Sequence, residues 1–320
     1  MKKVTIRDVA AAAGCSVSAV SYILNGSDKK KYSEATVKAV KKAAERLHYS
    51  PNAIARGMRS QKAHAIGIVN FWEANNATFA PVLRAIAEEA AKTRVSTVLC
   101  TGESNFSYIS AVSDRAVDGI ILFAPAALPF SERGHIREMQ KMGVRFVIVN
   151  GAVRSPDVFC AYFDYYAASA FAVRRFVDAK KTRILYVDEF SEAAAKELRE
   201  RREGYVDTMR ELGLAPLAED LATLTKEDLS GIEAIVTSRS ETARALLRRL
   251  LEWGIKVPEQ IEILSGCGEE EGKESFPPLS AVDFDRRALG EFAVSAVMGD
   301  KEPSCLCLGP IYRKGETAKV

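Results

Sequence analysis

Small hydroxyl-bearing side chains cluster close to the N-terminus. Ser16, Ser18 and Ser21 fall within six residues, Val17 lies among them, and Tyr22 follows directly. Small and polar groups on the exposed face of a helix can approach base edges, and serine hydroxyls and helix N-termini bind phosphate oxygens. The pattern predicts a surface that contacts double-stranded DNA.

Two short helices separated by a glycine must position these side chains. Thr5–Ala13 opens with a hydroxyl suited to capping and continues in strong helix formers. Gly14 can end that helix in a left-handed turn, and Ser16 can cap a second helix over Val17–Leu24. Ala10 and Val20 flank the glycine at the spacing of a helix-turn-helix, where a small residue lets the helices cross closely.

A third helix is predicted to begin at Ser33-Glu34 and to run to about Leu47. Its apolar side chains at three- and four-residue spacing should face a small core, and they are Val37, Val40, Ala44 and Leu47. The run Lys29-Lys30-Lys31 precedes this helix in a loop. A plain three-helix bundle is the structural alternative to a DNA-binding unit.

The charge is distributed unevenly along the 320 residues. The net charge is +3, but residues 1–62 carry +9 and the remainder carries −6. A compact basic segment attached to an acidic body is typical of a chain that binds a polyanion at one end. A solvated lysine-rich tail would give a similar count, but it would not carry helix caps and an apolar periodicity.

From Ala63 onward, apolar strand-like runs alternate with amphipathic helices. Eight strand-like runs are expected near residues 65–69, 95–100, 119–123, 144–149, 158–163, 183–187, 233–237 and 261–264, and helical patterns include 81–93, 165–177 and 192–212. This alternation predicts parallel sheets covered on both faces, in two lobes, with a ligand cleft at the carboxyl ends of the strands. The predicted fold class is therefore a small three-helix unit joined to a two-lobed α/β core.

Sequence signals for other classes of protein are missing. No glycine-rich phosphate loop, nucleophile elbow or metal-binding His-Glu helix occurs, so an enzyme is not expected, nor a cofactor. The six cysteines contain no Cys-x-x-Cys pair, which argues against zinc, and all six are expected to be reduced thiols; Cys305-x-Cys307 is expected on an alternating strand. No long apolar run or secretion signal is present, so we expect a cytoplasmic, nucleoid-associated protein that does not bind membranes.

At the level of motifs, the N-terminal sixty residues resemble the headpiece of the LacI/GalR repressor family. The resemblance rests on Thr5-Ile6-x-Asp8-Val9-Ala10-x-x-Ala13-Gly14-x-Ser16-x-x-x-Val20-Ser21-x-x-Leu24-Asn25 and on Leu47-x-Tyr49-x-Pro51-Asn52-x-x-Ala55-Arg56. It implies a homodimer that places two recognition helices in successive major grooves of an operator. By position it also implies that Ser16, Val17, Ser18, Ser21 and Tyr22 face the groove, while Thr5 and Asn25 bind the DNA backbone.

Two features of the headpiece depart from the family pattern. Tyr22 stands where family members often carry a basic side chain, so we expect an operator that differs from the usual consensus. The loop after Asn25 is about two residues longer than usual, and its lysines should add salt-sensitive affinity without specificity.

Residues 51–60 resemble the hinge helix of the same family, which folds on the operator and inserts an apolar side chain into the minor groove. Met58 takes the place of the usual leucine, and Asn52, Ala55 and Arg56 are the matching residues expected to contact DNA. An ordinary linker is the alternative.

The core resembles the periplasmic sugar-binding fold that this family uses for its effector domain. The resemblance includes Val117–Ile121 and Gly254–Glu259. The expected organisation is a headpiece over 1–48, a hinge over 49–62 and a core over 63–320. Within the core we expect an N-lobe of about 63–160 plus 284–305 and a C-lobe of about 161–283 plus 306–320.

Effector-binding residues follow from the resemblance, with departures. Arg201 matches the ligand-facing arginine of an Arg-x-x-Gly-Tyr element, and Asp164 matches a frequent aspartate, whereas Arg239-Ser240 replace the usual Asn-Asp. Two arginines without the usual acids favour an anion such as a sugar phosphate or carboxylate, unless Arg239 merely pairs with Glu241. Aromatic residues after the first strand could form a stacking wall or belong to the core, and they are Phe71, Trp72 and Phe79.

The predicted function is a homodimeric repressor that binds a pseudo-palindromic operator and responds to a small-molecule effector, either a sugar, a sugar phosphate or another small anion. The alternative is control by a partner, such as a seryl-phosphorylated phosphocarrier protein bound near residues 81–92 of the N-lobe. A transport receptor is disfavoured by the headpiece and by the missing secretion signal.

Overall fold

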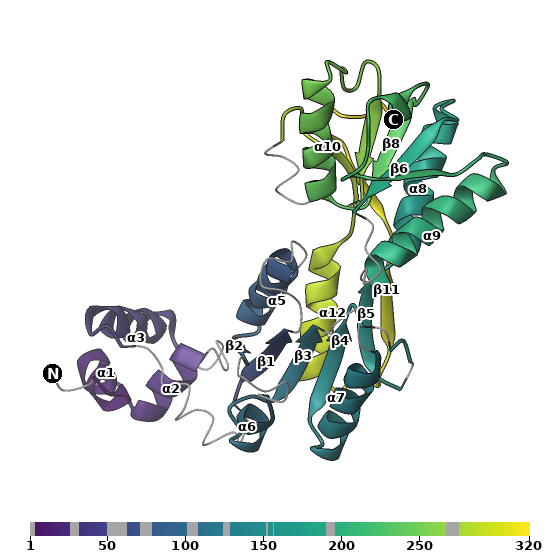
Figure 1. Ribbon diagram of the computed structural model, residues 1–320. Coiled ribbons are helices and arrows are strands. Elements are labelled where there is room, and N and C mark those ends of the chain that lie inside the picture. The colour runs from purple at the N-terminus through teal and green to yellow at the C-terminus, as the bar shows by residue number, and fades with distance from the viewer. Residues whose placement is uncertain are drawn as a thin grey trace. The chain divides into compact units, whose positions relative to one another are not determined.

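The chain folds into two compact units. The computed structural model describes residues 4–25, 32–49, 63–70, 79–100, 108–123, 129–151, 153–155, 157–189, 196–266 and 275–320. The units comprise residues 1–63 and 64–320 (Figure 1). Each is described by itself below.

The first unit contains α1 (Ile6–Ala13), α2 (Val17–Asn25) and α3 (Glu34–Arg46). Gly14 ends α1 in the left-handed region, at φ 62° and ψ 35°, as the sequence predicts. The amide of Cys15 donates to the carbonyl of Ala10 at 3.1 Å, and that of Gly14 to Ala11 at 3.4 Å. This pair of bonds is the Schellman arrangement, which turns the chain sharply from α1 into α2.

Side-chain caps fix where the helices begin. The Ser16 hydroxyl accepts from the Ala19 amide at 3.1 Å, as predicted. The Ser33 hydroxyl likewise caps α3 by accepting from the Thr36 amide at 3.3 Å. At α1, the Asp8 carboxylate accepts from both the amide and the hydroxyl of Thr5 at 2.7 Å. Asp8 therefore closes the start of α1, satisfying a backbone donor that the helix leaves free.

The three helices share a small apolar core. Val9, Val20 and Val40 are fully buried, and alanines from α1 and α3 surround them. Leu47 packs against this cluster, whereas Val37 is only half-buried. The predicted periodicity of α3 is thus confirmed at Val40, which the other two helices cover.

The second unit is built on two six-stranded sheets, as expected for a two-lobed α/β core. The first sheet has the order β11-β5-β4-β3-β1-β2 and the second β12-β10-β9-β8-β6-β7. The strands of the first are β1 (Ala65–Asn70), β2 (Ser96–Leu99), β3 (Gly119–Phe123), β4 (Arg145–Val149), β5 (Phe159–Phe163) and β11 (Cys305–Leu308). Those of the second are β6 (Ile184–Asp188), β7 (Leu217–Asp220), β8 (Ala234–Thr237), β9 (Glu262–Ser265), β10 (Ser280–Asp283) and β12 (Ile311–Arg313).

Strand pairing follows the prediction of parallel sheets. All pairs among the described strands are parallel except β10 with β12, which is antiparallel. β1, β3 and β4 are almost entirely buried apolar residues, because helices lie on both faces of the sheet (Figure 1).

Helices divide between the two lobes. The first lobe carries α5 (Phe79–Lys92), α6 (Tyr108–Ser113), α7 (Pro129–Lys141) and α12 (Arg286–Met298). The second carries α8 (Tyr165–Asp178), α9 (Lys196–Glu211), the short 3-10 helix η1 (Glu227–Leu229) and α10 (Ser240–Glu252). α5 packs against α12, and α8 against α9.

Within the described residues, the chain crosses between the lobes three times. β5 leads into α8, β10 into α12 and β11 into β12. Since β5 and β11 lie wholly in the first sheet, two crossovers follow Phe163 and Leu308, a few residues later than the expected boundaries near 160 and 305. The rings of Phe163 and Phe284 stack at 4.6 Å where two crossovers meet.

Cysteine pairing differs from the prediction. Cys160 and Cys305 form a disulfide, so the expectation of six reduced thiols is wrong for this pair. The two residues are register partners on the neighbouring strands β5 and β11, with Cα atoms 4.5 Å apart, although 145 residues separate them in sequence. Cys15, Cys100 and Cys307 are not part of a disulfide among the described residues, and Cys267 lies outside them.

Within the described residues, no helix is long and apolar enough to cross a membrane. The same residues contain no group of three or more His, Cys, Asp or Glu side chains that could hold a metal ion.

Candidate DNA-binding surface and effector site

α2 presents a polar face opposite its buried one. Ala19 and Val20 are buried, whereas Ser16 and Ser18 are exposed and Tyr22 is 47% exposed. The two exposed serine hydroxyls lie 3.0 Å apart. Ser18 and Tyr22 are four residues apart, so they lie one turn from each other on the same face of the helix.

Two other predicted groove-facing residues are partly buried. Ser21 is half-buried, and Val17 packs against the headpiece core. Val17 therefore has a structural role as well, because its position at the first turn of α2 brings it over the core. The exposed part of the predicted surface consists of Ser16, Ser18 and Tyr22.

The remaining predicted DNA contacts are described only in part. Thr5 is exposed at the start of α1, with its hydroxyl held by Asp8. Asn25 is the last residue of α2, and its side chain lies outside the described part of the structure. The predicted hinge contacts also lie outside the described residues, and they are Asn52, Ala55, Arg56 and Met58.

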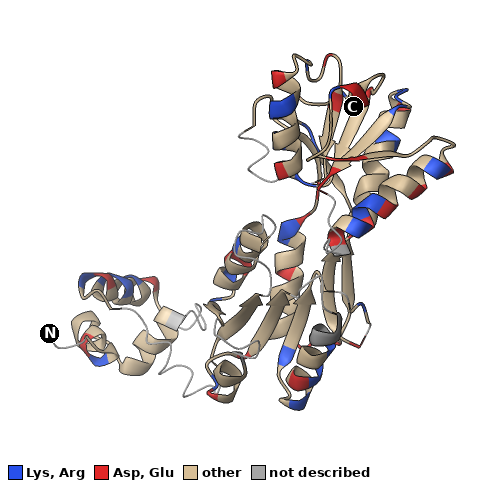
Figure 2. Ribbon diagram, viewed as in Figure 1, with Lys and Arg blue, Asp and Glu red and all other residues tan. Residues whose placement is uncertain are grey.

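Basic side chains lie on the outer surface of the headpiece. Lys38, Lys41, Lys42 and Arg46 are all exposed on α3, where Figure 2 shows blue segments. Together with the lysines of the preceding loop, they account for much of the +9 charge of residues 1–62. This charge suits a surface that approaches phosphates.

In the second unit, Arg201 is a buried cation. It lies on α9 with 2% of its surface exposed, and its Nη1 donates to the carbonyl of Gly266 at 2.7 Å. Its guanidinium carbon lies 4.4 Å from the centre of the Tyr165 ring. A buried guanidinium needs such partners because its desolvation is otherwise unfavourable.

The Arg-x-x-Gly-Tyr element has a clear structural basis. A Cβ at Gly204 would lie 2.2 Å from the carbonyl oxygen of Tyr166, so glycine lets α9 approach the backbone of α8. The Tyr205 hydroxyl lies 2.8 Å from the carbonyls of Ile184 and Leu217 and accepts from the Leu217 amide at 2.9 Å. Burial raises the pKa of Tyr205 to about 12, which keeps this hydroxyl protonated.

Asp188 is a buried acid that sequence reasoning missed. It ends β6 with 4% of its surface exposed. Its Oδ1 accepts from the Ser238 hydroxyl at 2.5 Å and from the Glu189 amide at 2.8 Å, and its Oδ2 from the Tyr186 hydroxyl at 3.4 Å. Desolvation raises the pKa of Asp188, although the bond from Ser238 acts in the opposite direction. Its position at the carboxyl end of a buried strand was the available signal.

Arg239 has a different partner from the one considered in the sequence. Its Nη2 lies 2.5 Å from Oε1 of Glu197 on α9, and the pair is partly buried. Arg239 therefore forms its ion pair with a residue distant in sequence, Glu197, and not with the neighbouring Glu241. Ser240 begins α10 fully buried, with its hydroxyl 3.4 Å from the Glu241 carboxylate.

Asp164 and Phe79 have local roles in the structure. The Asp164 Oδ1 caps α8 by accepting from the Ala167 amide at 2.9 Å. The ring of Phe79 is buried edge-to-face against Phe123, 5.0 Å between centres, which is the core placement rather than the stacking wall. Phe71 and Trp72 lie outside the described residues.

These observations bring five residues together as a candidate effector site, called the effector cluster below: Tyr165, Asp188, Arg201, Ser238 and Arg239. Asp188 is the last residue of β6, and Ser238 and Gly266 directly follow β8 and β9. These three strands are neighbours in the second sheet. α9 supplies Arg201 and the partner of Arg239. The cluster offers both hydrogen-bond donors and an acid at the edge where ligands of open parallel sheets bind.

The fold and these two surfaces define a class: a DNA-binding headpiece on a two-lobed ligand-binding core. Comparison with known proteins gives the same result. Residues 5–52 match the model of bacterial regulatory proteins of the lacI family, and residues 173–303 match the periplasmic binding protein-like domain.

Relatives match over most of the chain. The HTH-type transcriptional repressor PurR of Vibrio campbellii is 25% identical over 314 residues, covering 92% of this chain and 91% of that protein. Catabolite control protein A of Priestia megaterium is 27% identical, covering 82% and 81%. The regulator GalR of Escherichia coli is 29% identical, covering 73% and 66%.

Solved structures share the fold. The lac repressor dimer bound to operator and an anti-inducer aligns with a TM-score of 0.69 at 21% identity, over 99% of both chains. The complex of the regulator CelR with cellobiose aligns with a TM-score of 0.64 at 22% identity, over 99% and 100%. The chain thus combines a helix-turn-helix headpiece of the lacI family with a periplasmic binding protein-like core, and its relatives are transcriptional regulators rather than enzymes.

Proposed function

We propose that this chain is a homodimeric repressor that reads its operator through α2 and is controlled by a small molecule bound at the effector cluster. Family members bind DNA operators and small-molecule effectors as dimers. The observation that supports the DNA-binding part best is the exposed face of Ser16, Ser18 and Tyr22, on a helix capped by Ser16 and set behind the left-handed Gly14. We further propose that it acts in the cytoplasm.

Base readout is assigned to this exposed face. Tyr22 is large and exposed, and a phenol can donate or accept one hydrogen bond but cannot form the bidentate pair that arginine makes with guanine. We therefore infer that the operator position read by Tyr22 differs from that of family members with a basic side chain there. Thr5, Val17, Ser21 and Asn25 complete the proposed contacts in the headpiece, with Asn52, Ala55, Arg56 and Met58 in the hinge.

The test is selection of binding sites from a random duplex library, with wild-type protein and with Tyr22→Ala. We expect the variant to change base preference at one position in each half-site, with a discrimination loss of about 0.5–1.5 kcal/mol at that position, the contribution of a single neutral hydrogen bond. Lys30→Ala is the control, because loss of a loop cation should weaken binding to all sequences alike. An unchanged base profile for Tyr22→Ala would exclude Tyr22 as a base reader.

The effector cluster favours a ligand rich in hydroxyl groups. Asp188 supplies a carboxylate and Arg201 a guanidinium, and charged groups of both signs form strong bonds with paired hydroxyls in a desolvated site. Arg239, which would otherwise favour an anion, is already paired with Glu197 at 2.5 Å. We therefore infer that a neutral sugar is a better candidate effector than a sugar phosphate or another small anion. Asp164 and Ser240 lie beside this set in sequence and complete the proposed site.

A thermal-shift screen tests the effector with sugars, sugar phosphates and small carboxylates. A ligand at 100 times its Kd should stabilise the folded protein by about 2.7 kcal/mol, and we expect the largest shift from a neutral sugar. Arg201→Met should remove the shift. A flat response across the panel would contradict control by these ligands and favour a partner protein such as a phosphocarrier.

A further inference from the structure

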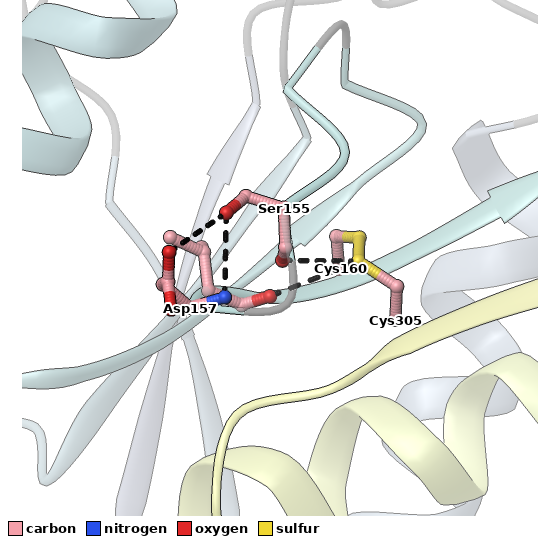
Figure 3. Close-up of a disulfide and its surroundings, with 5 residues drawn as sticks. Ser155, Asp157, Cys160 and Cys305 are labelled. Atoms are coloured by element: carbon pink, nitrogen blue, oxygen red, sulfur yellow. Dashed lines mark hydrogen bonds between the residues drawn. A yellow bond between two sulfur atoms is a disulfide. The ribbon is translucent and has the colours of Figure 1, made fainter.

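A disulfide joins two strands through which the first lobe connects to the second. β5 ends at Phe163, immediately before the crossover into α8, and β11 ends at Leu308, with two residues between it and the start of β12. Cys160 and Cys305 are directly opposite each other near the start of this parallel pair (Figure 3). The bridge therefore ties together two segments that lead out of the lobe.

β11 depends on this contact because it is an edge strand. Its neighbour in the first sheet is β5, and the ends of the pair are held by the bonds from Cys160 N to Ser304 O at 3.1 Å and from Asp164 N to Leu308 O at 3.0 Å. An edge strand has a ladder on one side and is held less firmly than an inner one. With the disulfide reduced, β11 would be held in the sheet only by its backbone hydrogen bonds with β5 and by the packing of Leu306 and Leu308.

The bridge is open to attack from one side. Cys305 is exposed, whereas Cys160 is 2% exposed. A thiolate from solvent can therefore reach Cys305 Sγ, with Cys160 Sγ as the leaving group. Cys305 Sγ also lies 3.3 Å from the carbonyl oxygen of Ser155, as Figure 3 shows, so the thiol formed on reduction has an acceptor in place.

The same strand contacts the start of α8. Cys307 lies two residues after Cys305, and its Sγ is 3.8 Å from Oδ2 of Asp164. Asp164 caps α8. The first residue of that helix is Tyr165, and the guanidinium of Arg201 stacks over its ring. A change in how β11 is held therefore reaches the effector cluster through one contact and one helix cap.

We propose that Cys160 and Cys305 are a reversible thiol–disulfide site whose state sets how firmly β11 is held, and thereby the response of the regulator. The regulatory part rests on the proposed function, because a repressor acts on DNA where thiol reductants keep most cysteines reduced. Cysteine pairs that bridge in such a compartment are usually transient and redox-sensing.

The chemistry needs a dithiol as reductant. One thiolate of the dithiol attacks Cys305 Sγ, the sulfur–sulfur bond breaks, and its electron pair leaves on Cys160 Sγ, which takes up a proton. The second thiol of the dithiol, deprotonated, displaces Cys305, which is protonated in turn. The protein gains two electrons and two protons, and the dithiol becomes a disulfide. Exchange with a low-molecular-weight disulfide reverses the reaction.

The first test uses the full chain equilibrated with mixtures of reduced and oxidised dithiothreitol, followed by alkylation and peptide mass spectrometry. We expect Cys160 and Cys305 to pass together from protected to alkylated as the mixture becomes more reducing, with the same behaviour in Cys307→Ser. Alkylation of both cysteines under the oxidising mixture would overturn the proposal.

The second test is amide hydrogen exchange of peptides covering residues 303–313 in both redox states. We expect about tenfold or faster exchange on reduction, and the same fast exchange in Cys305→Ser whatever the redox state. Because Cys305 is exposed, this variant should fold even where Cys160→Ser does not. Equal exchange in the two states of the wild type would overturn the proposal.

The third test measures the affinity of both states for the selected operator. We expect a change of about fivefold or more between oxidised and reduced protein, the lower end of usual allosteric couplings, and none in Cys305→Ser. Equal Kd values with altered exchange would overturn the regulatory part. Loss of sequence preference in both states would overturn the proposed function, and the regulatory part with it, while the alkylation and exchange results would stand.

Discussion

Two buried charged side chains of opposite sign dominate the effector cluster. Arg201 is satisfied by the carbonyl of Gly266 and the ring of Tyr165, whereas Asp188 is satisfied by the hydroxyls of Ser238 and Tyr186. Burying either charge without partners would be strongly unfavourable, so the hydrogen bonds are necessary for stability as well as suited to a ligand. A ligand that binds here must replace some of these bonds with its own.

The raised pKa of Asp188 leads to a prediction about pH. A carboxyl whose pKa is higher in the folded state binds its proton more tightly there, so its stabilising contribution is present at low pH and is lost as pH rises through the folded pKa. Asp188→Asn removes this dependence and retains the acceptor for Ser238. We therefore expect Asp188→Asn to be more stable relative to wild type at pH 7 than at pH 4, that is, its free energy of unfolding minus that of wild type should be larger at pH 7.

Urea denaturation at a series of pH values measures this difference. The control is Asp220→Asn, at the end of the neighbouring β7, whose carboxylate is only partly buried. A difference between Asp188→Asn and wild type that is constant across pH would contradict the role assigned to desolvation.

Close approach of two helices is what places Arg201. α9 crosses α8 where Gly204 meets the backbone of Tyr166, and the residues on this face of α9 then reach the second sheet. Tyr205 anchors the same turn through the carbonyls of β6 and β7. The position of the buried cation therefore depends on a glycine that carries no chemistry itself.

Gly204→Ala should force the two helices apart. The added Cβ would lie 2.2 Å from the Tyr166 oxygen, a backbone atom that cannot rotate away, so we expect a loss of about 1–3 kcal/mol or more in unfolding free energy. Gly134→Ala on α7 is the matched control, because among the described residues no atom beyond its own helix backbone and chain neighbours lies within 4 Å of its Cβ, and alanine favours helix by about 1 kcal/mol. Urea denaturation of both variants decides, and equal stability would refute the close-approach argument.

The whole molecule separates charge between its two units. Residues 1–62 carry +9 and the rest carries −6, so the electrostatic attraction to DNA is concentrated in the headpiece and hinge. Counterion release then makes affinity fall steeply with salt, with a slope of about −0.9 for each phosphate neutralised.

We therefore expect the operator affinity to fall by about 10³-fold or more between 50 and 200 mM salt, as for proteins with six or more phosphate contacts. Replacing Lys29, Lys30 and Lys31 together by alanine should make the slope shallower. Lys92→Ala, which removes an exposed lysine of the core paired with Glu89, should leave it unchanged. Fluorescence anisotropy at several salt concentrations gives the slopes, and a core variant that alters the slope as much as the loop variant would contradict this separation.

Local sequence was enough to determine the headpiece and the succession of strands and helices. The left-handed Gly14, the serine caps and the buried strands depend on residues within a few positions of one another, and such signals are visible in a single chain. The class of regulator followed from the same local motifs, together with Arg201 in its Arg-x-x-Gly-Tyr element.

Contacts between distant residues were decided only by the tertiary structure. The pairing of Arg239 with Glu197, the bond from Ser238 to Asp188 and the bridge between Cys160 and Cys305 all join segments from different elements. Each depends on which strands are neighbours in a sheet and in what register, because that order places carboxyl ends and side chains opposite one another. Periodicity within a segment carries no information about this order, so the partners could be identified only once the sheets were assembled.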